Sequence, residues 1–153
     1  MPDFTLSRFL PFRLNRLADR LSRQIMPIYR DAQGIGRAEW RVMAHLGADD
    51  GATASQLVTL TALDKVRVSR ACAALESRGW ISRRPDRQDR RAQLVTLTPQ
   101  GRAALDGLTP DMLAAESALL AQLTPDQQHR LAQVLDDLEQ VLGLSGGPTD
   151  PPA

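Results

Sequence analysis

The chain has 153 residues, the usual size of one domain or one compact subunit, and 42% of them are hydrophobic and 24% charged. No apolar run approaches the roughly 18 to 20 residues that span a bilayer, and the N-terminus lacks the pattern of a signal peptide. A single cysteine excludes an internal disulfide framework, so we expect a soluble, cytoplasmic protein.

The net charge of +1 conceals a strong asymmetry along the chain. Residues 65–91 include nine basic and three acidic side chains, a net charge of +6. Residues 92–153 include two basic and eight acidic side chains, a net charge of −6. A localised basic segment is typical of a surface that binds a polyanion, and its alternative interpretation is a solvated charged face.

Two helices are predicted in the N-terminal part of the chain. Apolar residues recur at spacings of three and four over 11–33, which predicts an amphipathic helix. Pro27 should kink or stop this helix near its C-terminal end, because proline lacks the backbone N–H that a helix interior uses. The apolar residues between 37 and 46 predict a second helix.

Two further helices follow at positions with strong N-terminal signals. Thr53 and Gln56 have the spacing of a capping box, which predicts a short third helix. Asp64 is a favourable N-cap for a fourth helix that Gly79 ends. The inward face of the fourth helix should consist of Val68, Ala71, Cys72 and Leu75.

The period then changes to that of strands. Residues 80–84 and 92–98 are predicted to be two short strands joined by the almost wholly polar segment 85–91. Thr98 followed by proline predicts a new helix that runs to about Leu123 with a bend around 107–110. The segment that follows Thr124 predicts a last helix.

This order of elements predicts a mainly α protein with a small β wing. A winged helix-turn-helix DNA-binding domain is expected over 37–98. An N-terminal dimerisation helix over 11–33 and C-terminal dimerisation helices over 99–143 should flank it, and 144–153 is expected to be a disordered tail.

Candidate DNA contacts lie on the outer face of the fourth helix and on the wing. A helix-turn-helix places its second helix in the major groove, where the planar fork of arginine can bond guanine or grip a phosphate. Arginines at the wing tip are suited to the negative potential of a narrow minor groove. The outward residues of the helix include Lys65, Arg67, Ser69 and Arg70, and the tip carries Arg87, Asp89, Arg90 and Arg91.

Four stretches of the sequence resemble the MarR (multiple antibiotic resistance regulator) family, and the similarity covers almost everything except the two termini. They are DKVRVSR at 64–70, LESRGWI at 75–81, RRPDRQDRR at 83–91 and LTPQGR at 97–102. The wing with its Asp-Arg-Arg, followed by a Leu-Thr-x-x-Gly turn, is highly specific for that family.

The resemblance implies a homodimeric transcription factor, usually a repressor, that releases a pseudopalindromic operator when a small, often aromatic, ligand binds. It assigns recognition-helix contacts to Arg67, Ser69 and Arg70, and the wing pair to Asp89 with Arg90 or Arg91. Val66 departs from the family pattern, which often has Ser or Thr there, and an apolar contact to DNA is expected in its place.

A dimer is also expected from the apolar stripe of the last helix. Such a stripe must be buried somewhere, either between two subunits, which we favour, or in an intramolecular core. A two-fold dimer would present two recognition helices about one DNA turn apart. The stripe consists of Leu131, Val134, Leu135, Leu138, Val141 and Leu142.

Other kinds of site have weaker support. Two histidines and one cysteine are too few for a dedicated metal site, and no nucleophile-and-base pair or phosphate-binding glycine loop indicates catalysis, so neither a cofactor nor an enzyme is expected. Cys72 is either an oxidant sensor or, as we favour, a packing residue.

A ligand pocket is expected between the dimer helices and the DNA-binding lobe, lined by Arg13, Arg16, Trp40, Met43 and His45. In the alternative interpretation, Trp40 and Met43 belong to the core and His45 is a partly exposed histidine.

We therefore expect a dimeric, sequence-specific regulator that binds double-stranded DNA, responds to a small-molecule effector and has no membrane partner. The alternatives are a winged-helix interaction or scaffold subunit, and a DNA-binding dimer that responds to no ligand. The basic residues on both the helix and the wing argue against the scaffold.

Overall fold

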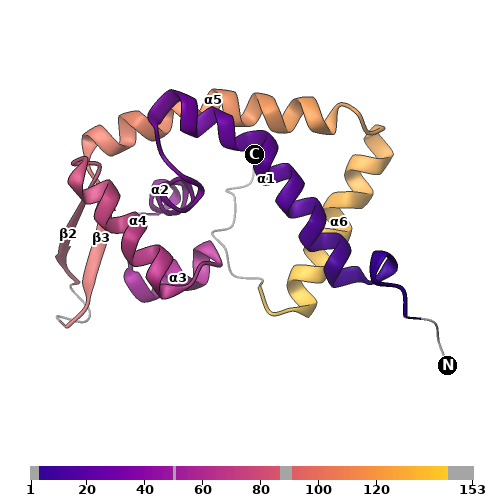
Figure 1. The fold of residues 1–153 in the computed structure, drawn as a ribbon, viewed down its shortest axis with the longest axis horizontal. Coiled ribbons are helices and arrows are strands. Elements are labelled where there is room, and N and C mark those ends of the chain that lie inside the picture. Colours follow the sequence, from indigo (N-terminus) through magenta and orange to yellow (C-terminus); the bar gives the residue numbers. More distant parts are fainter. Residues whose placement is uncertain (1–3, 50, 87–90, 145–153) are drawn as a thin grey trace.

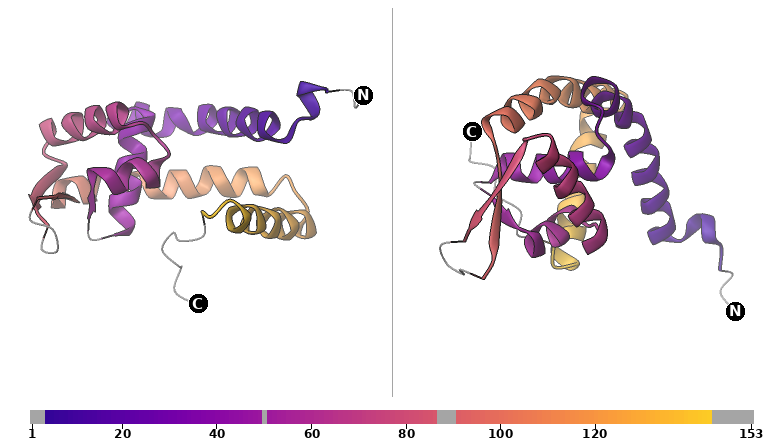
Figure 2. Two further views of the ribbon diagram at one scale, coloured as in Figure 1. Left: turned by 90° about the horizontal axis from the view of Figure 1, so that it is seen from below. Right: turned by 60° about the vertical axis from the view of Figure 1, so that its left-hand side comes forward.

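The computed structural model describes residues 4–49, 51–86 and 91–144. These residues form six α-helices, one short 3-10 helix and a three-stranded antiparallel sheet. Helix α1 (Leu10–Gln33) and helix α5 (Pro99–Leu120) contact each other, and α5 leads into α6 (Pro125–Val141) at the end far from the sheet (Figure 1, Figure 2). None of the described helices is both long and apolar enough to cross a membrane. The tail expected over 144–153 lies outside the described residues except for its first residue.

The winged helix lies between these long helices in the sequence. It consists of α2 (Arg37–Ala48), β1 (Ala52–Thr53), α3 (Ala54–Thr61), α4 (Lys65–Ser77), β2 (Ile81–Pro85) and β3 (Gln93–Leu97). The sheet has the order β1-β3-β2, and β2 pairs with β3 from Ile81 opposite Leu97 to Pro85 opposite Gln93. The predicted order of elements and the mainly α fold with a small β wing are therefore confirmed.

Local capping explains where most of these helices begin. Thr53 and Gln56 form both hydrogen bonds of a capping box at α3, and Thr124 and Gln127 form the same pair at α6. The Thr98 hydroxyl accepts a hydrogen bond from the Gly101 N–H at the start of α5. Each cap satisfies backbone donors that the first helical turn leaves without partners.

Both internal prolines lie within continuous helices. Helix α1 continues past Pro27 to Gln33, the end predicted for it, so the stop is excluded as one of the two effects expected of this proline. The last turns of α1 persist because Tyr29 is fully buried and its neighbours pack against the core, which offsets the backbone hydrogen bond that proline removes. Helix α5 is one helix across Pro110 and ends at Leu120, slightly before the predicted Leu123.

The core is centred on the winged helix, and the long helices add Tyr29 of α1 and Leu105 and Leu108 of α5 to it. Val42, Met43 and Leu46 of α2 pack with Leu57 of α3 and Val95 of β3, and all five are essentially inaccessible to solvent. The inner face of α4 adds the four residues that the sequence analysis predicted. This packing fixes the recognition helix on one side and leaves its other side free.

Candidate nucleic-acid interface

The outer face of α4 is a polar, exposed surface on a fixed helix. Asp64 caps the helix by accepting a hydrogen bond of 2.8 Å from the backbone N–H of Arg67. The side chains predicted to contact DNA are all exposed on this helix: Lys65, Val66, Arg67, Ser69 and Arg70. Val66 is 58% exposed, which is unusual for a valine and leaves its methyl groups available for an apolar contact.

Arg67 is oriented by the residue that caps its helix. Its Nε lies 3.3 Å from the Asp64 Oδ2, so one carboxylate holds both the backbone and the guanidinium of the same residue. Both side chains are largely exposed, so this ion pair adds little stability. It does restrict the directions in which the guanidinium can point. The sequence pattern alone indicated only the capping role of Asp64.

The wing is attached to the recognition helix through Arg83. The Nε of Arg83 on β2 lies 3.2 Å from the Glu76 Oε2 on α4. At the base of the hairpin, the Asp86 N–H donates to the Ala92 carbonyl over 3.0 Å. Arg91 is exposed beside it, and the predicted tip residues Arg87, Asp89 and Arg90 lie outside the described residues.

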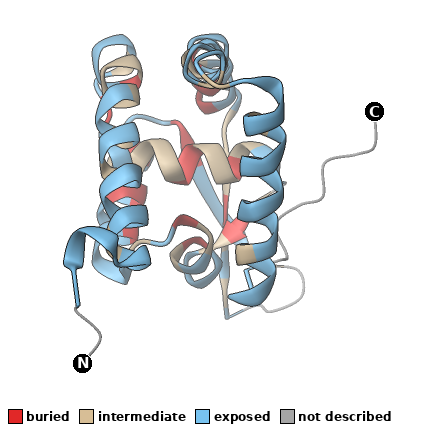
Figure 3. Ribbon diagram, turned by 90° about the vertical axis from the view of Figure 1, so that its right-hand side faces the viewer, coloured by how far each residue is buried: buried red, intermediate tan, exposed pale blue. Residues whose placement is uncertain are grey.

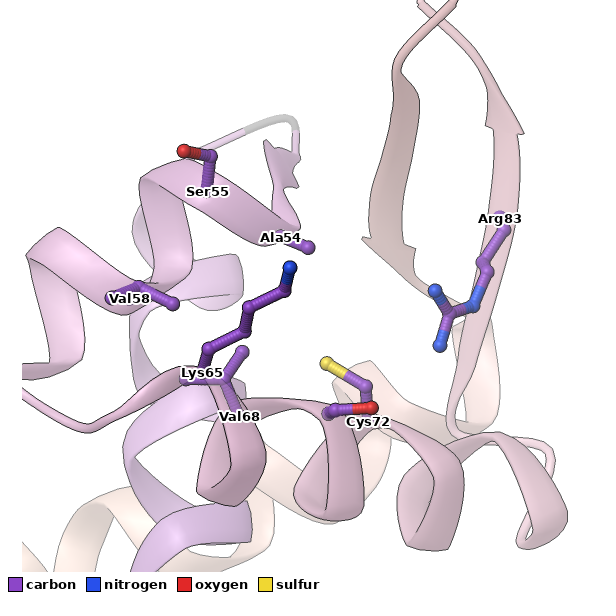
Figure 4. Close-up of a pocket in the computed structure, with 8 residues that line it drawn as sticks. Ala54, Ser55, Val58, Lys65, Val68, Cys72 and Arg83 are labelled. Carbon is purple, nitrogen blue, oxygen red and sulfur yellow. The ribbon is translucent and has the colours of Figure 1, made fainter.

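A cavity of about 470 Å³ lies between α3, α4 and β2 (Figure 4). Lys65 extends into it from the start of α4, and the guanidinium of Arg83 points across it towards the Cys72 thiol. Serine hydroxyls and small apolar side chains complete the lining, and the described residues that line it include two cations and no carboxylate. Neither Arg83 nor Ser55 could be predicted at a site, because nothing local in the sequence indicates that a strand residue and the start of α3 enclose one space.

Cys72 is buried on the inner face of α4, at the floor of this cavity. Burial raises the pKa of its thiol above the usual value, and the nearby Arg83 opposes that rise only in part. A buried thiol that stays protonated at neutral pH is a poor nucleophile. The environment therefore favours packing over oxidant sensing, which was the preferred prediction.

The residues predicted to line a ligand pocket occupy separate environments. Arg13 and Arg16 are exposed on α1, and His45 is partly buried on α2. Trp40 stacks on Tyr29 with ring centroids 5.9 Å apart and an interplanar angle of 6°, while Met43 is fully buried in the core. The cavity beside α4 is lined by other residues. The described part of the chain contains no group of three or more His, Cys, Asp or Glu side chains suited to a metal ion.

The apolar stripe of α6 is not covered by the described part of the chain. Figure 3 shows α6 and the N-terminal half of α1 almost entirely in the colour of exposed residues. Leu138 is partly buried, and the other stripe residues are exposed: Leu131, Val134, Leu135, Val141 and Leu142. Leu14, Leu17 and Leu21 of α1 are exposed as well. Two amphipathic helices thus present apolar faces to solvent.

Comparisons with known proteins agree with this geometry. The family model described as "MarR family" matches residues 33–92. The HTH-type transcriptional regulator YdgJ of Bacillus subtilis is 29% identical over 102 residues, which are 67% of this chain and 62% of YdgJ.

Solved structures extend the similarity to nearly the whole chain. The MarR family transcriptional regulator SPO1453 from Silicibacter pomeroyi is 31% identical, with a TM-score of 0.78 over 92% of this chain and 99% of that one. The transcriptional repressor CouR, found in Rhodococcus jostii and solved on a 23-mer DNA duplex, is 25% identical, with a TM-score of 0.73 over 89% and 98% of the two chains. These relatives are transcriptional regulators and not enzymes. The chain is therefore a member of the MarR family of DNA-binding transcriptional regulators.

Proposed function

We propose that this regulator acts as a homodimeric repressor that reads a two-fold symmetric operator and releases it when a small ligand binds. The observation that carries the proposal is the exposed face of α4, whose side chains are held outward by a fully packed inner face. A preformed polar helix face of this kind can enter the major groove without refolding.

The residues of α4 have different chemical roles in this proposal. Arg67 and Arg70 are three residues apart and project from one face, where a guanidinium can bond guanine O6 and N7 together. Lys65, at the first helical position, is suited to a phosphate, because a flexible point charge needs no fixed geometry there. CouR was solved on a DNA duplex, which supports the same use of this fold here.

Dimerisation is supported by the uncovered stripes of α1 and α6. Exposed apolar side chains on two long helices would be buried if a second copy packed against them. A groove between α1 and α5, lined by Leu21, Ile25, Met112 and Leu119, offers a place for apolar side chains of that copy. A two-fold arrangement would then place two α4 helices on one face of the duplex.

An effector has support from the cavity beside α4. Its two cations and apolar walls suit a small organic anion with an aromatic or aliphatic body. Such a ligand would engage Lys65, which is also one of the proposed DNA contacts, so it would compete with the operator. CouR has also been solved with p-coumaroyl-CoA.

The test is selection of bound sequences from a random duplex library with the full-length protein. We expect enrichment of a two-fold symmetric sequence whose half-sites lie about one helical turn apart. Binding to random duplex should weaken steeply as salt rises, because phosphate contacts release counterions. A library that yields no enriched sequence, together with salt-independent binding, would favour the scaffold alternative.

A further inference from the structure

The turn between α4 and β2 is the place where the recognition helix meets both long helices. We define this turn, Arg78, Gly79 and Trp80, as the junction. It follows the last residue of α4 directly and precedes the first residue of the wing. Any movement of α1 or α5 relative to the recognition helix must therefore act on the junction or break its contacts.

Arg78 connects the junction to the C-terminal end of α1. Its Nη1 donates to the Gln33 carbonyl over 2.8 Å, and its Nη2 donates to the Gly34 carbonyl over 2.9 Å. The last carbonyls of a helix have no partner within the helix and carry partial negative charge, so a guanidinium is well suited to them. The same guanidinium lies 5.0 Å from the ring centroid of Trp80, which limits its other positions.

The start of α5 is attached to the other two residues of the junction, Gly79 and Trp80. The Thr98 N–H donates to the Trp80 carbonyl over 3.0 Å, and the Thr98 hydroxyl donates to the Gly79 carbonyl over 2.6 Å. Gly101 packs so closely that an added Cβ would overlap the Trp80 carbonyl oxygen. The backbone of the junction is thus fixed to α5, and the side chain of Arg78 fixes it to α1.

We propose that Arg78 is a positioning residue that sets the direction of the recognition helix relative to α1, and thereby the half-site spacing that the dimer accepts. The inference rests on the proposed function, because spacing has meaning only for a dimer that reads DNA. Arg78 acts through α1 and does not touch DNA. Its replacement should change which spacings are tolerated while the base and phosphate contacts of each half-site remain.

The chain offers a matched control for the removal of such a bond. The Nη1 of Arg41 on α2 donates to the Thr61 carbonyl at the end of α3 over 3.0 Å. This is the same type of bond, from an arginine to the end of a helix, but it lies wholly within the winged helix. Arg41→Gln should lower stability and leave in place both hydrogen bonds of Arg78 to the C-terminal end of α1.

The experiment uses the operator selected by the wild-type dimer and two variants of it, with one base pair added to or removed from the centre. One base pair moves a half-site by about 3.4 Å and rotates it by roughly a tenth of a turn, so a rigid dimer should discriminate strongly against both variants. Arg78→Gln should reduce that discrimination by about five-fold or more, the lower end of usual coupling between sites. Arg78→Lys keeps the charge but not the planar guanidinium, so its discrimination between spacings should lie between those of the wild type and Arg78→Gln. Arg41→Gln should discriminate between spacings as the wild type does.

The outcomes separate this inference from the proposed function. If the wild type selects no symmetric operator, the proposed function fails. If it does, and Arg78→Gln and Arg78→Lys both discriminate as the wild type does, the positioning role is wrong. A flatter salt dependence of Arg78→Gln binding, with equally weakened affinity at all three spacings, would show that Arg78 contacts phosphate and would overturn the inference.

A second measurement needs no DNA. Ala73 is exposed on α4, so a spin label attached through Ala73→Cys, in a Cys72→Ala background, reports the separation of the two recognition helices of a dimer. The added Arg78→Gln change should broaden the distribution of label-to-label distances, and Arg41→Gln should not. Equal widths in all three proteins would contradict the role of Arg78, whereas no measurable distance in any of them would contradict the homodimer.

Discussion

Two glycines of α5 should respond in opposite ways to the same substitution. An added Cβ at Gly101 would overlap the Trp80 carbonyl oxygen and lie 2.8 Å from the Trp80 carbonyl carbon. These atoms belong to the backbone and cannot rotate away, so Gly101→Ala must push α5 away from the junction. An added Cβ at Gly107 would meet only the side-chain nitrogen of Gln33, at 4.0 Å.

The expected magnitudes follow from these contacts. Overpacking costs about 1 to 3 kcal/mol, and breaking the hydrogen bond from Thr98 to Trp80 adds about 1 kcal/mol. Alanine regains roughly 0.5 to 1 kcal/mol over glycine in a helix, so Gly101→Ala should lower the free energy of unfolding by about 1 to 3 kcal/mol. Gly107→Ala should raise it by up to about 1 kcal/mol, because only the helix preference of alanine remains.

Urea denaturation followed by far-ultraviolet circular dichroism measures both values. All proteins must be compared at one protomer concentration, because the stability of a dimer depends on it. A Gly101→Ala protein as stable as the wild type would refute the close packing of α5 on the junction. A destabilised Gly107→Ala protein would refute the assignment of open space beside that residue.

Three further predictions concern the dimer face, the wing and the buried thiol. Leu135→Asp should weaken self-association and operator binding together, because it places a charge in an apolar seam; a variant that stays dimeric by light scattering at micromolar concentration would contradict the interface. Arg90→Ala should weaken DNA binding with little change in melting temperature. It should also flatten the slope of log K, the binding constant for DNA, against log salt by about one unit for each phosphate that is no longer neutralised, and an unchanged slope and affinity would show that Arg90 does not contact DNA. The raised pKa of Cys72 means that the folded state holds the thiol proton more tightly than the unfolded state. The contribution of this thiol to stability is therefore complete below its unfolded pKa and is lost as pH rises through the higher folded pKa. A thiol reagent at neutral pH should therefore modify Cys72 only after unfolding, and rapid labelling of the folded protein would contradict its burial.

The features that the sequence predicted well are those encoded locally. Thr53 with Gln56 and Asp64 with Arg67 satisfy backbone donors within one turn, so their spacing alone locates the start of a helix. The alternation of buried and exposed residues on α4 follows from a helical period of 3.6 residues in the same way. These local patterns place the exposed face of α4, and its role in DNA binding follows from the order of the elements and from the resemblance to the MarR family.

The features that the sequence analysis missed depend on residues far apart in the chain. Strand β1 has only two residues, too few for any periodicity, and exists because Ala52 and Thr53 pair with β3. The bonds of Arg78 to the end of α1 join residues 44 and 45 positions apart. The stop that Pro27 could have caused is absent for the same reason, since the packing of the residues after it outweighs its local effect.

The central claim is that α4 reads bases through arginine and holds phosphate through lysine, and one paired measurement tests it most directly. Arg67→Ala and Lys65→Ala would each be titrated with the selected operator and with a scrambled duplex at one fixed salt concentration. An arginine that reads a base discriminates between sequences by about 1 to 3 kcal/mol for each good bidentate contact. Arg67→Ala should therefore reduce the difference in binding free energy between the operator and the scrambled duplex. Lys65→Ala should lower both affinities together. If Lys65→Ala reduces this difference in binding free energy and Arg67→Ala does not, the helix enters the groove in a different orientation and the assignment of roles is wrong.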